Sequence, residues 1–245
     1  IFAAQCGHDV TLYEKRAELG GKIVFARHAD FKYALNDTLI YQKNMVEKLG
    51  VKVVLNCEAT PEMIAAENFD VVFAAVGSDP VIIPIPGHDL PNVTTAEPCF
   101  GNLDKLGERI VVIGGGEVGC ETALYLARGG KTVSIIEMLP ELAAASAYAP
   151  QLAIQDLLPK VADVHVNARS AYITDHSVGY VDLTDNTEHE IPCDTVVFSA
   201  GMRSRTALAE SFRDCAPVFF KLGDCKQAKN VRVCNRTAFD AAKQI

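Results

Sequence analysis

The spacing of apolar residues divides the chain into alternating helices and strands. Residues 31–49 carry apolar side chains at the three-to-four-residue spacing of an amphipathic helix, which Gly50 ends. Short apolar runs predict strands, and the run at 70–76 is apolar enough to be buried on both faces. The remaining predicted strands lie at 10–13, 51–55, 108–113, 132–137, 161–167, 171–183 and 193–199, and the helices at 1–5, 60–67, 118–128, 151–158 and 236–245. This alternation is typical of an α/β fold with parallel sheets covered by helices, although we expect the strands at 161–183 to pair antiparallel.

The start of the chain has the pattern of the second half of a βαβ unit. Residues 1–5 resemble the last turn of a helix, and Gly7 fits the left-handed position that follows such a turn. The strand at 10–13 then ends at Glu14. We therefore expect the first strand and glycine turn of this unit to be absent from the sequence.

Two local signals qualify the pattern further along. Thr60 and Pro61 have the residue types of a helix N-cap and first helical position. Prolines are frequent between residues 84 and 98, which predicts a connection on the surface.

The two halves of the chain repeat one plan. Each half has a strand that ends in a glutamate, Glu14 or Glu137, and each later has a buried strand that runs into a turn of small residues. The sequences of the second feature are VVFAAVGSDP and TVVFSAGMRS. We interpret the halves as two related nucleotide-binding domains.

Composition and charge narrow the function. The formal net charge of -8 argues against nucleic acid, because phosphate binding needs a positive surface. No apolar run approaches the roughly 20 residues that span a bilayer, and no signal peptide is recognisable, so we expect a cytoplasmic protein without a membrane partner.

The 8 cysteines are scattered, with neither a C-x-x-C pair nor the spacing of a zinc site. We expect reduced, mostly buried thiols, no metal site and no redox-active disulfide. Cys225 follows Gly223 and Asp224 directly, which leaves two interpretations: a small buried residue or a residue near a nucleotide.

The segment Gly114-Gly115-Gly116-Glu117-Val118-Gly119 satisfies the pattern G-x-G-x-x-G between a predicted strand and a predicted helix. Gly114 permits the tight turn, Gly116 lets the backbone touch a pyrophosphate, and Gly119 lets the helix pack against the strand. The N–H groups at the start of the helix, around Glu117 and Val118, would face the phosphates. A turn that only connects strand to helix is the alternative.

Glu137 lies 23 residues after Gly114, at the end of the next predicted strand. A carboxylate there accepts hydrogen bonds from a ribose 2′-hydroxyl and repels a 2′-phosphate. No arginine occurs among the next residues, Met-Leu-Pro-Glu. The spacing therefore predicts a site for NAD in preference to NADP.

The motifs VTLYEKRAELGGK, FDVVFAAVGSDP, ERIVVIGGGEVGCETALYLARGGKTVSIIEM, DTVVFSAGMRS and KLGDC follow one another in this order. Together they resemble the C-terminal region of the NADH:flavin oxidoreductase family that includes 2-enoate reductase, 2,4-dienoyl-CoA reductase and trimethylamine dehydrogenase. The resemblance covers nearly the whole chain. It implies two Rossmann-like domains of the FAD/NAD(P)-binding flavoprotein type, an FAD domain at 1–100 plus 218–245 and an NAD domain inserted at 101–217.

The resemblance also implies the cofactor-binding residues. Glu14, with Lys15 beside it, would meet the adenosine ribose of FAD, and Gly20 and Gly21 would lie near its pyrophosphate. Five further residues would line the nucleotides, with Gly201 at the nicotinamide and the others at FAD: Ala75, Gly77, Gly201, Gly223 and Asp224. No residue of this chain is implied as a catalytic acid or base.

In the family, an N-terminal barrel of the same parent chain holds FMN, the substrate and a [4Fe–4S] centre. We expect hydride to pass from NADH to FAD, and electrons to pass onward to that barrel, which is absent here and reduces an activated C=C bond such as a 2-enoate. Alone, the chain would be inactive on this final substrate, and a homo-oligomer would form through the parent chain. The alternative function is a non-catalytic structural module that binds ADP or NAD.

Overall fold

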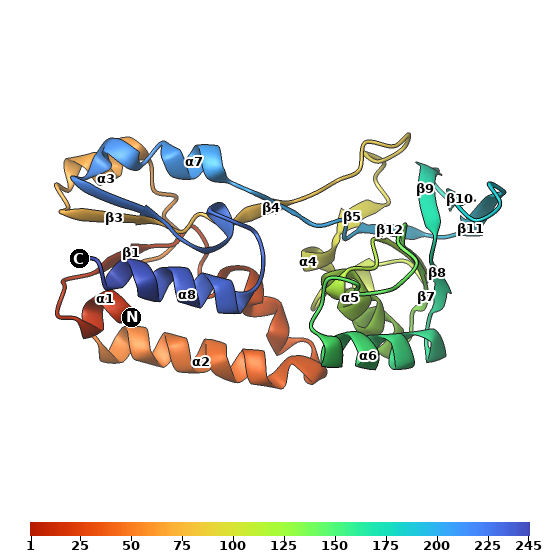
Figure 1. Ribbon diagram of the computed structural model, residues 1–245, viewed down its shortest axis with the longest axis horizontal. Coiled ribbons are helices and arrows are strands. Elements are labelled where there is room, and N and C mark those ends of the chain that lie inside the picture. The colour runs from red at the N-terminus through yellow and green to blue at the C-terminus, as the bar shows by residue number, and fades with distance from the viewer. The chain divides into compact units, whose positions relative to one another are not determined.

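The computed structural model describes residues 1–245, which form two compact units. Unit 1 consists of Ile1–Asp79 and Met202–Ile245, and unit 2 consists of Pro80–Gly201 (Figure 1). The chain therefore leaves unit 1 once, builds unit 2 as an insertion, and returns. The two crossing segments contain the short strands β4 (Ser78–Pro80) and β13 (Met202–Ser204), which pair with each other.

Unit 2 is built on a parallel sheet of five strands in the order β5-β12-β6-β7-β8. The bounds of these strands are β5 (Val93–Thr95), β6 (Arg109–Ile113), β7 (Thr132–Ile136), β8 (Asp163–His165) and β12 (Thr195–Phe198). The three inner strands, β12, β6 and β7, are flanked on both sides and buried on both faces, apart from Arg109 and Thr132 at the starts of β6 and β7. They position the loops at their carboxyl ends.

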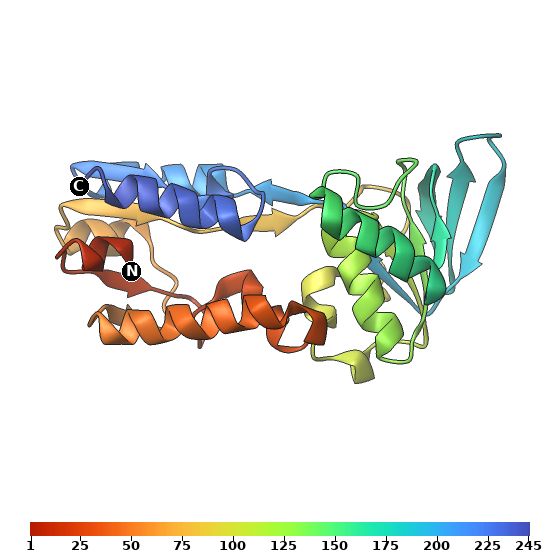
Figure 2. The ribbon, with the colours of Figure 1, turned by 60° about the horizontal axis from the view of Figure 1, so that its bottom comes forward.

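Alternate residues of the sheet enter two separate cores. Ile110 and Val112 pack with helix α5 (Glu117–Arg128), whereas Val111 and Ile113 pack with residues of the antiparallel strands on the other face. Those strands are β9 (Ala168–Ile173), β10 (Ser177–Asp182) and β11 (Glu188–Pro192), and Figure 2 shows them as a separate sheet. The helices α4 (Ala96–Cys99) and α6 (Tyr148–Leu157) complete the unit.

Unit 1 contains two parallel strand pairs and five α-helices. Strand β1 (Thr11–Tyr13) pairs with β2 (Lys52–Val54), and β3 (Val71–Ala74) pairs with β14 (Val218–Lys221). The helices are α1 (Phe2–Gln5), α2 (Tyr33–Lys48), α3 (Pro61–Ala66), α7 (Thr206–Glu210) and α8 (Val231–Ala242). Helix α1 lies beside α8, where the rings of Phe2 and Phe239 meet edge to face (Figure 1).

Local sequence signals account for several boundaries. The Thr60 hydroxyl accepts a hydrogen bond from the Met63 N–H at 3.3 Å, and Pro61 occupies the first position of α3. Gly7 and Gly50 both have positive φ, of 94° and 68°, directly after the ends of α1 and α2. No helix combines the length and apolar character that crossing a membrane requires.

The unit boundaries differ from the sequence-based expectation. The segment 80–100 lies in unit 2, because β5 adds to its sheet beside β12. The segment 202–217 lies in unit 1, where Ala209 of α7 packs against Ala74 and Cys225. The expected surface connection at 84–98 is thus wrong in its last residues, since Ala96 is buried.

Three element predictions also need correction. Strand β3 buries only Val72 and Ala74, with the alternate residues half-buried, so it is covered on one face rather than two. The expected strand at 171–183 is a hairpin of β9 and β10 with a turn at 174–176, and β8 pairs parallel with β7. Helix α8 begins at Val231 rather than 236, because the Asn230 side chain caps it by accepting from the Val233 N–H at 3.1 Å.

Candidate functional site

The glycine turn of unit 2 lies at the carboxyl end of β6. Gly114 has a φ of 108°, and its N–H donates to the Ile136 carbonyl at 2.9 Å, which ties the turn to the end of β7. Gly116 is the N-cap of α5. The predicted strand, turn and helix therefore occur in sequence, at the edge of the sheet where dinucleotides bind in folds of this type.

Three glycines of the turn differ in the space around them. A Cβ at Gly119 would lie 1.9 Å from the Gly114 carbonyl oxygen, and a Cβ at Gly114 would lie 2.5 Å from that of Ser199. A Cβ at Gly116 would meet nothing within 4 Å. Gly114 and Gly119 thus permit close packing of the fold, whereas Gly116 faces open space in which a phosphate could approach the backbone.

The N-terminus of α5 has the donors that a pyrophosphate needs. No side chain caps this helix, so its first N–H groups remain available, and Val118 is 53% exposed. The Glu117 carboxylate turns toward the following loop and accepts from the Ser146 hydroxyl at 3.1 Å. The turn of Gly201 lies next to this site, because Ser199 donates its N–H to Ile113 at 2.8 Å.

The Glu137 carboxylate reaches back to the glycine turn. Its Oε2 accepts the N–H of Gly115 at 2.5 Å, and its Oε1 accepts the N–H of Leu139 at 2.8 Å. The acid and the turn therefore form one local structure. Gly115 is a functional candidate that the sequence pattern misses, since G-x-G-x-x-G leaves its position variable.

In unit 1, a chain of contacts joins several of the residues implied for FAD. Glu14 Oε1 accepts the Arg16 N–H at 2.8 Å, and the Arg16 guanidinium donates to the Gly21 carbonyl at 3.2 Å. The next residue, Lys22, donates from Nζ to the Ser78 carbonyl at 2.5 Å. Gly20 and Gly21 have positive φ, of 125° and 52°. Arg16 and Lys22 thus bring two cations to this group of residues, and neither was singled out from the sequence.

Gly223 and Asp224, near the C-terminus, belong to the same network of contacts in unit 1. The buried Ser78 hydroxyl donates to Asp224 Oδ2 at 3.2 Å, and the Gly223 N–H donates to the Thr237 hydroxyl at 2.9 Å. Gly77, with a φ of 77°, precedes Ser78 directly. Asp224 and Gly77 are thus brought together, and a Cβ at Gly21 or Gly77 would meet nothing within 4 Å.

Two implied residues lie apart from these contacts. Ala75 is exposed just beyond β3. The Lys15 side chain is 47% exposed and pairs with Glu58 at 3.6 Å, on the surface.

An ion pair stabilises the segment that follows Gly77. The Arg205 guanidinium donates to Asp79 Oδ1 from Nε at 2.8 Å and also reaches the Val76 carbonyl at 3.3 Å. Hydrogen bonding from Arg205 holds the pKa of Asp79 below its usual value. Asp79 therefore remains ionised beside the turn at Gly77, and Arg205 neutralises its charge.

Burial makes several of the thiols poor nucleophiles. All 8 are free, and burial raises the pKa of Cys99 and of Cys120 to about 12. Cys225 is fully buried and its thiol donates to the Ala74 carbonyl at 3.0 Å, in agreement with its interpretation as a small buried residue.

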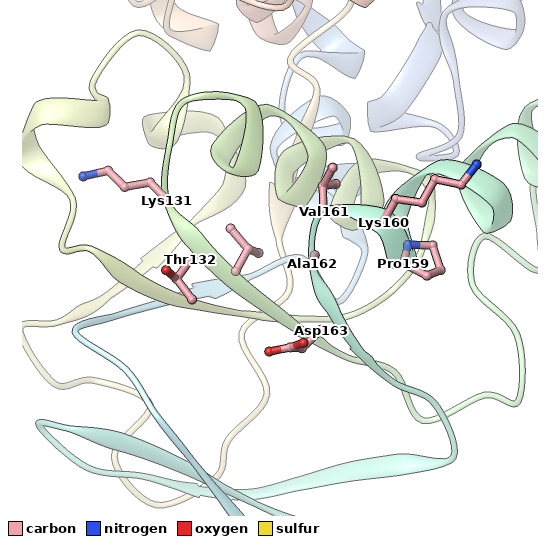
Figure 3. Close-up of a pocket in the computed structure, with 8 residues that line it drawn as sticks. Lys131, Thr132, Pro159, Lys160, Val161, Ala162 and Asp163 are labelled. Carbon is pink, nitrogen blue, oxygen red and sulfur yellow. The ribbon is translucent and has the colours of Figure 1, made fainter.

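A pocket of about 350 Å³ lies elsewhere on unit 2 (Figure 3). Its lining includes Thr132 and Asp163, the first residues of β7 and β8, so it lies at the amino ends of the parallel strands. The Lys131 amine on its rim is already paired with Glu108 at 2.9 Å. Nucleotides bind at the opposite, carboxyl ends, so this pocket is not the nucleotide site.

Fold and site together define a flavoprotein oxidoreductase of the Rossmann type, with FAD- and NAD(P)-binding units. The family model described as pyridine nucleotide-disulphide oxidoreductase matches residues 1–218, and the chain belongs to that family. Its similarity to the FAD/NAD part of the NADH:flavin oxidoreductases is confirmed by the relatives below.

Cinnamate reductase of Clostridium sporogenes is 34% identical over 246 residues, which cover 99% of this chain and 36% of the relative. Bilirubin reductase of Mediterraneibacter gnavus is 34% identical, with 90% and 34% covered. The solved complex of 2-naphthoyl-CoA reductase with 2-naphthoyl-CoA superposes with a TM-score of 0.90 at 32% identity, over 98% of this chain and 36% of that one. The chain thus spans about a third of the length of these relatives. The family and these reductases indicate binding of FAD and NAD(P)H.

Proposed function

We propose that unit 2 binds NADH at the glycine turn. Gly114, Gly116, Glu117, Val118 and Gly119 would place the backbone of the turn and the start of α5 against the pyrophosphate. Two features support this assignment: the uncapped N-terminus of α5 and the open space at Gly116. Glu137 would accept the adenosine ribose hydroxyls, and Gly201 would border the nicotinamide.

Unit 1 is proposed to bind FAD. Glu14 would meet the adenosine ribose, with Gly20, Gly21 and the cations of Arg16 and Lys22 at the pyrophosphate. Gly77, Gly223 and Asp224 would line the rest of the nucleotide, with Lys15 and Ala75 at its margin. The chain of contacts from Glu14 to Asp224 supports this assignment.

The reaction proposed for the two units is the oxidation of NADH. FAD, when bound, supplies the acceptor for the hydride. The residues of this chain bind and orient the two nucleotides, and none of them is required to give or take a proton.

We extend the proposal to the parent enzyme. An FMN- and iron–sulfur-binding barrel of the same parent chain would receive the electrons and reduce an activated C=C bond, such as a 2-enoate. Two relatives named for cinnamate and 2-naphthoyl-CoA, both conjugated carbonyl compounds, support this extension. The cytoplasmic location and a homo-oligomer formed through the parent chain stay predictions.

A second candidate function is a non-catalytic module that binds ADP or NAD. The geometry of the glycine turn in unit 2 would serve such a module equally well. The family resemblance assigns Asp224 to the ribityl part of a flavin, and this role would favour the redox function, because a module that holds only ADP has no use for a carboxylate there. Bound flavin distinguishes the two functions.

The observation that carries the NADH assignment is the Glu137 carboxylate held over the glycine turn. Replacing Glu137 with Ala should weaken NADH binding about tenfold, because a hydrogen bond to a charged group contributes about 1.5–3 kcal/mol, while NADPH should bind as before or better. Calorimetric titration of the Glu137→Ala variant measures both. Glu141→Ala is the matched control, since it removes a neighbouring exposed acid that no glycine contacts. Unchanged discrimination in Glu137→Ala would contradict the assignment.

A further inference from the structure

Gly115 stands at a position that the dinucleotide-binding pattern leaves variable, yet the structure requires glycine there. Its backbone does not adopt the left-handed conformation that favours glycine, unlike that of Gly114. The requirement is one of space. A Cβ at position 115 would lie 2.8 Å from the Cβ and 3.0 Å from the Cγ of Glu137, closer than side-chain atoms approach one another.

The peptide groups of Gly115 are also bound on both sides. Its N–H donates to Glu137 Oε2 at 2.5 Å, and its carbonyl accepts from the Ala143 N–H at 2.8 Å and from the Cys120 thiol at 3.2 Å. Ala143 is buried and holds a φ of 52°, which is unfavourable for alanine. Such a conformation persists only where the surroundings fix it, and here the Gly115 carbonyl is among them.

The loop from Glu137 to Ala143 therefore closes over the central peptide of the glycine turn. Leu142 belongs to the same contact, because its Cδ2 would lie 2.7 Å from a Cβ at Gly115. At its base the loop is held by the Ala168 N–H, which donates to the Glu137 carbonyl at 2.9 Å. The main chain of Glu137 and its Cβ are thus fixed, so a group inserted at Gly115 must push the Gly115 backbone away from Glu137, which separates the Gly115 N–H from the carboxylate that it holds.

We propose that Gly115 is a specificity-determining residue of the nucleotide site, which positions the Glu137 carboxylate and thereby sets the preference for NADH over NADPH. The inference rests on the proposed NADH site and adds to it the residue that holds the acid in place. Gly115 acts through Glu137, so it is a positioning residue.

This role predicts a change in the ratio of two affinities rather than a general loss of binding. In Gly115→Ala the added methyl group separates the Glu137 carboxylate from the N–H that holds it. The ratio of the dissociation constant for NADPH to that for NADH should therefore fall about tenfold, the value of one hydrogen bond to a charged group. A merely structural role would weaken both nucleotides equally and leave the ratio unchanged. Calorimetric titration of the purified protein with NADH and with NADPH gives the ratio.

A double-mutant cycle tests whether Gly115 acts through the acid. Once Glu137→Ala has removed the carboxylate, adding Gly115→Ala should not lower the ratio of the NADPH and NADH dissociation constants any further. A further fall of about tenfold in this ratio in the double variant, the amount seen in Gly115→Ala alone, would overturn the proposal. Gly129→Ala, at the other end of α5, is the matched control, because its Cβ would also be crowded, by Leu103 Cδ1 at 2.5 Å and the Leu126 carbonyl oxygen at 3.3 Å, but touches no residue of the nucleotide site.

A second variant keeps the experiment decisive if Gly115→Ala unfolds, which circular dichroism would reveal. Gly115→Ala with Leu142→Ala removes the leucine methyl that the new side chain would meet, and it should show the same narrowed ratio. A wild-type preference for NADH that both variants retain would overturn the inference alone. A wild-type protein that binds NADH and NADPH equally would overturn the proposed function as well.

Discussion

Glu14 and Glu137 have the same relationship to the backbone that follows them. In each, Oε1 accepts the N–H of the residue two positions further along, Arg16 or Leu139, at 2.8 Å. Each carboxylate follows directly from the end of a parallel strand, β1 or β7. The two units thus contain the same device for orienting an acid at a strand end, which supports the interpretation that they bind nucleotides in equivalent ways.

The first prediction concerns Glu14. Replacing Glu14 with Ala should lower flavin retention about tenfold. The Arg16 N–H binds Glu14 Oε1, and the variant would lose the other oxygen, Oε2, which is proposed to accept from the adenosine ribose. The molar ratio of flavin to protein after purification and dialysis measures the loss. Glu58→Ala is the control, since Glu58 is 74% exposed and pairs only with Lys15. Equal retention in the Glu14 variant and the wild type would contradict the equivalence of the two acids.

The second prediction concerns Gly119. A methyl group there would lie 1.9 Å from the Gly114 carbonyl oxygen, so α5 must move away from β6 in Gly119→Ala. Overpacking of this kind costs about 1–3 kcal/mol, and the free energy of unfolding should fall by about 2 kcal/mol in urea titrations followed by circular dichroism. Gly130→Ala controls for packing, because its Cβ would meet nothing within 4 Å. This control has a cost of its own, since Gly130 has a φ of 87°, which alanine tolerates less well than glycine. A Gly119→Ala variant as stable as the wild type would show that the helix is not packed so closely.

The βαβ unit of the nucleotide site could be predicted from sequence almost to the residue. β6, the glycine turn, α5 and β7 follow the expected order because apolar periodicity, glycine spacing and helix ending are all local signals. Thr60 as an N-cap was predictable for the same reason.

Other elements depend on partners that are distant in the sequence. β5 is only three residues long and becomes a strand because β12, about a hundred residues later, offers it a parallel edge. The 3-10 helix Gly21–Arg27 has no strong local signal, and with it Lys22 was missed. Gly115 could not be recognised either, because its requirement for glycine comes from the Glu137 side chain, 22 residues away.

The third prediction concerns the pH dependence of stability. Hydrogen bonds from Arg109 lower the pKa of Asp194 from 3.8 to about 2. Because the folded-state pKa is depressed, this contribution is present in full above the unfolded value near 3.8 and is lost as the pH falls toward about 2. The urea midpoint of Asp194→Asn should therefore lie below that of the wild type at pH 7, and the gap should shrink below about pH 4. A gap that stays constant down to pH 3 would contradict this assignment.

The fourth prediction concerns thiol reactivity. Cys6 is exposed, whereas Cys99, Cys120, Cys193 and Cys225 are buried, and burial raises the pKa of the Cys193 thiol to about 11. Iodoacetamide at pH 8 should therefore label Cys6 in the native protein well before it labels any of the four buried thiols, because the thiolate is the reactive form. Peptide mass spectrometry at timed intervals follows each site. Early labelling of Cys120 would indicate that the loop after Glu137 opens readily.

The central claim is that this chain passes hydride from NADH to a flavin. The most direct measurement is an anaerobic titration of the purified protein with NADH, and in parallel with NADPH, while the flavin absorbance is followed. We expect bound FAD, identified by mass after denaturation, whose absorbance NADH bleaches more effectively than NADPH. A protein that releases ADP, NAD or no nucleotide, and shows no flavin for NADH to bleach, would contradict it and favour the non-catalytic nucleotide-binding module.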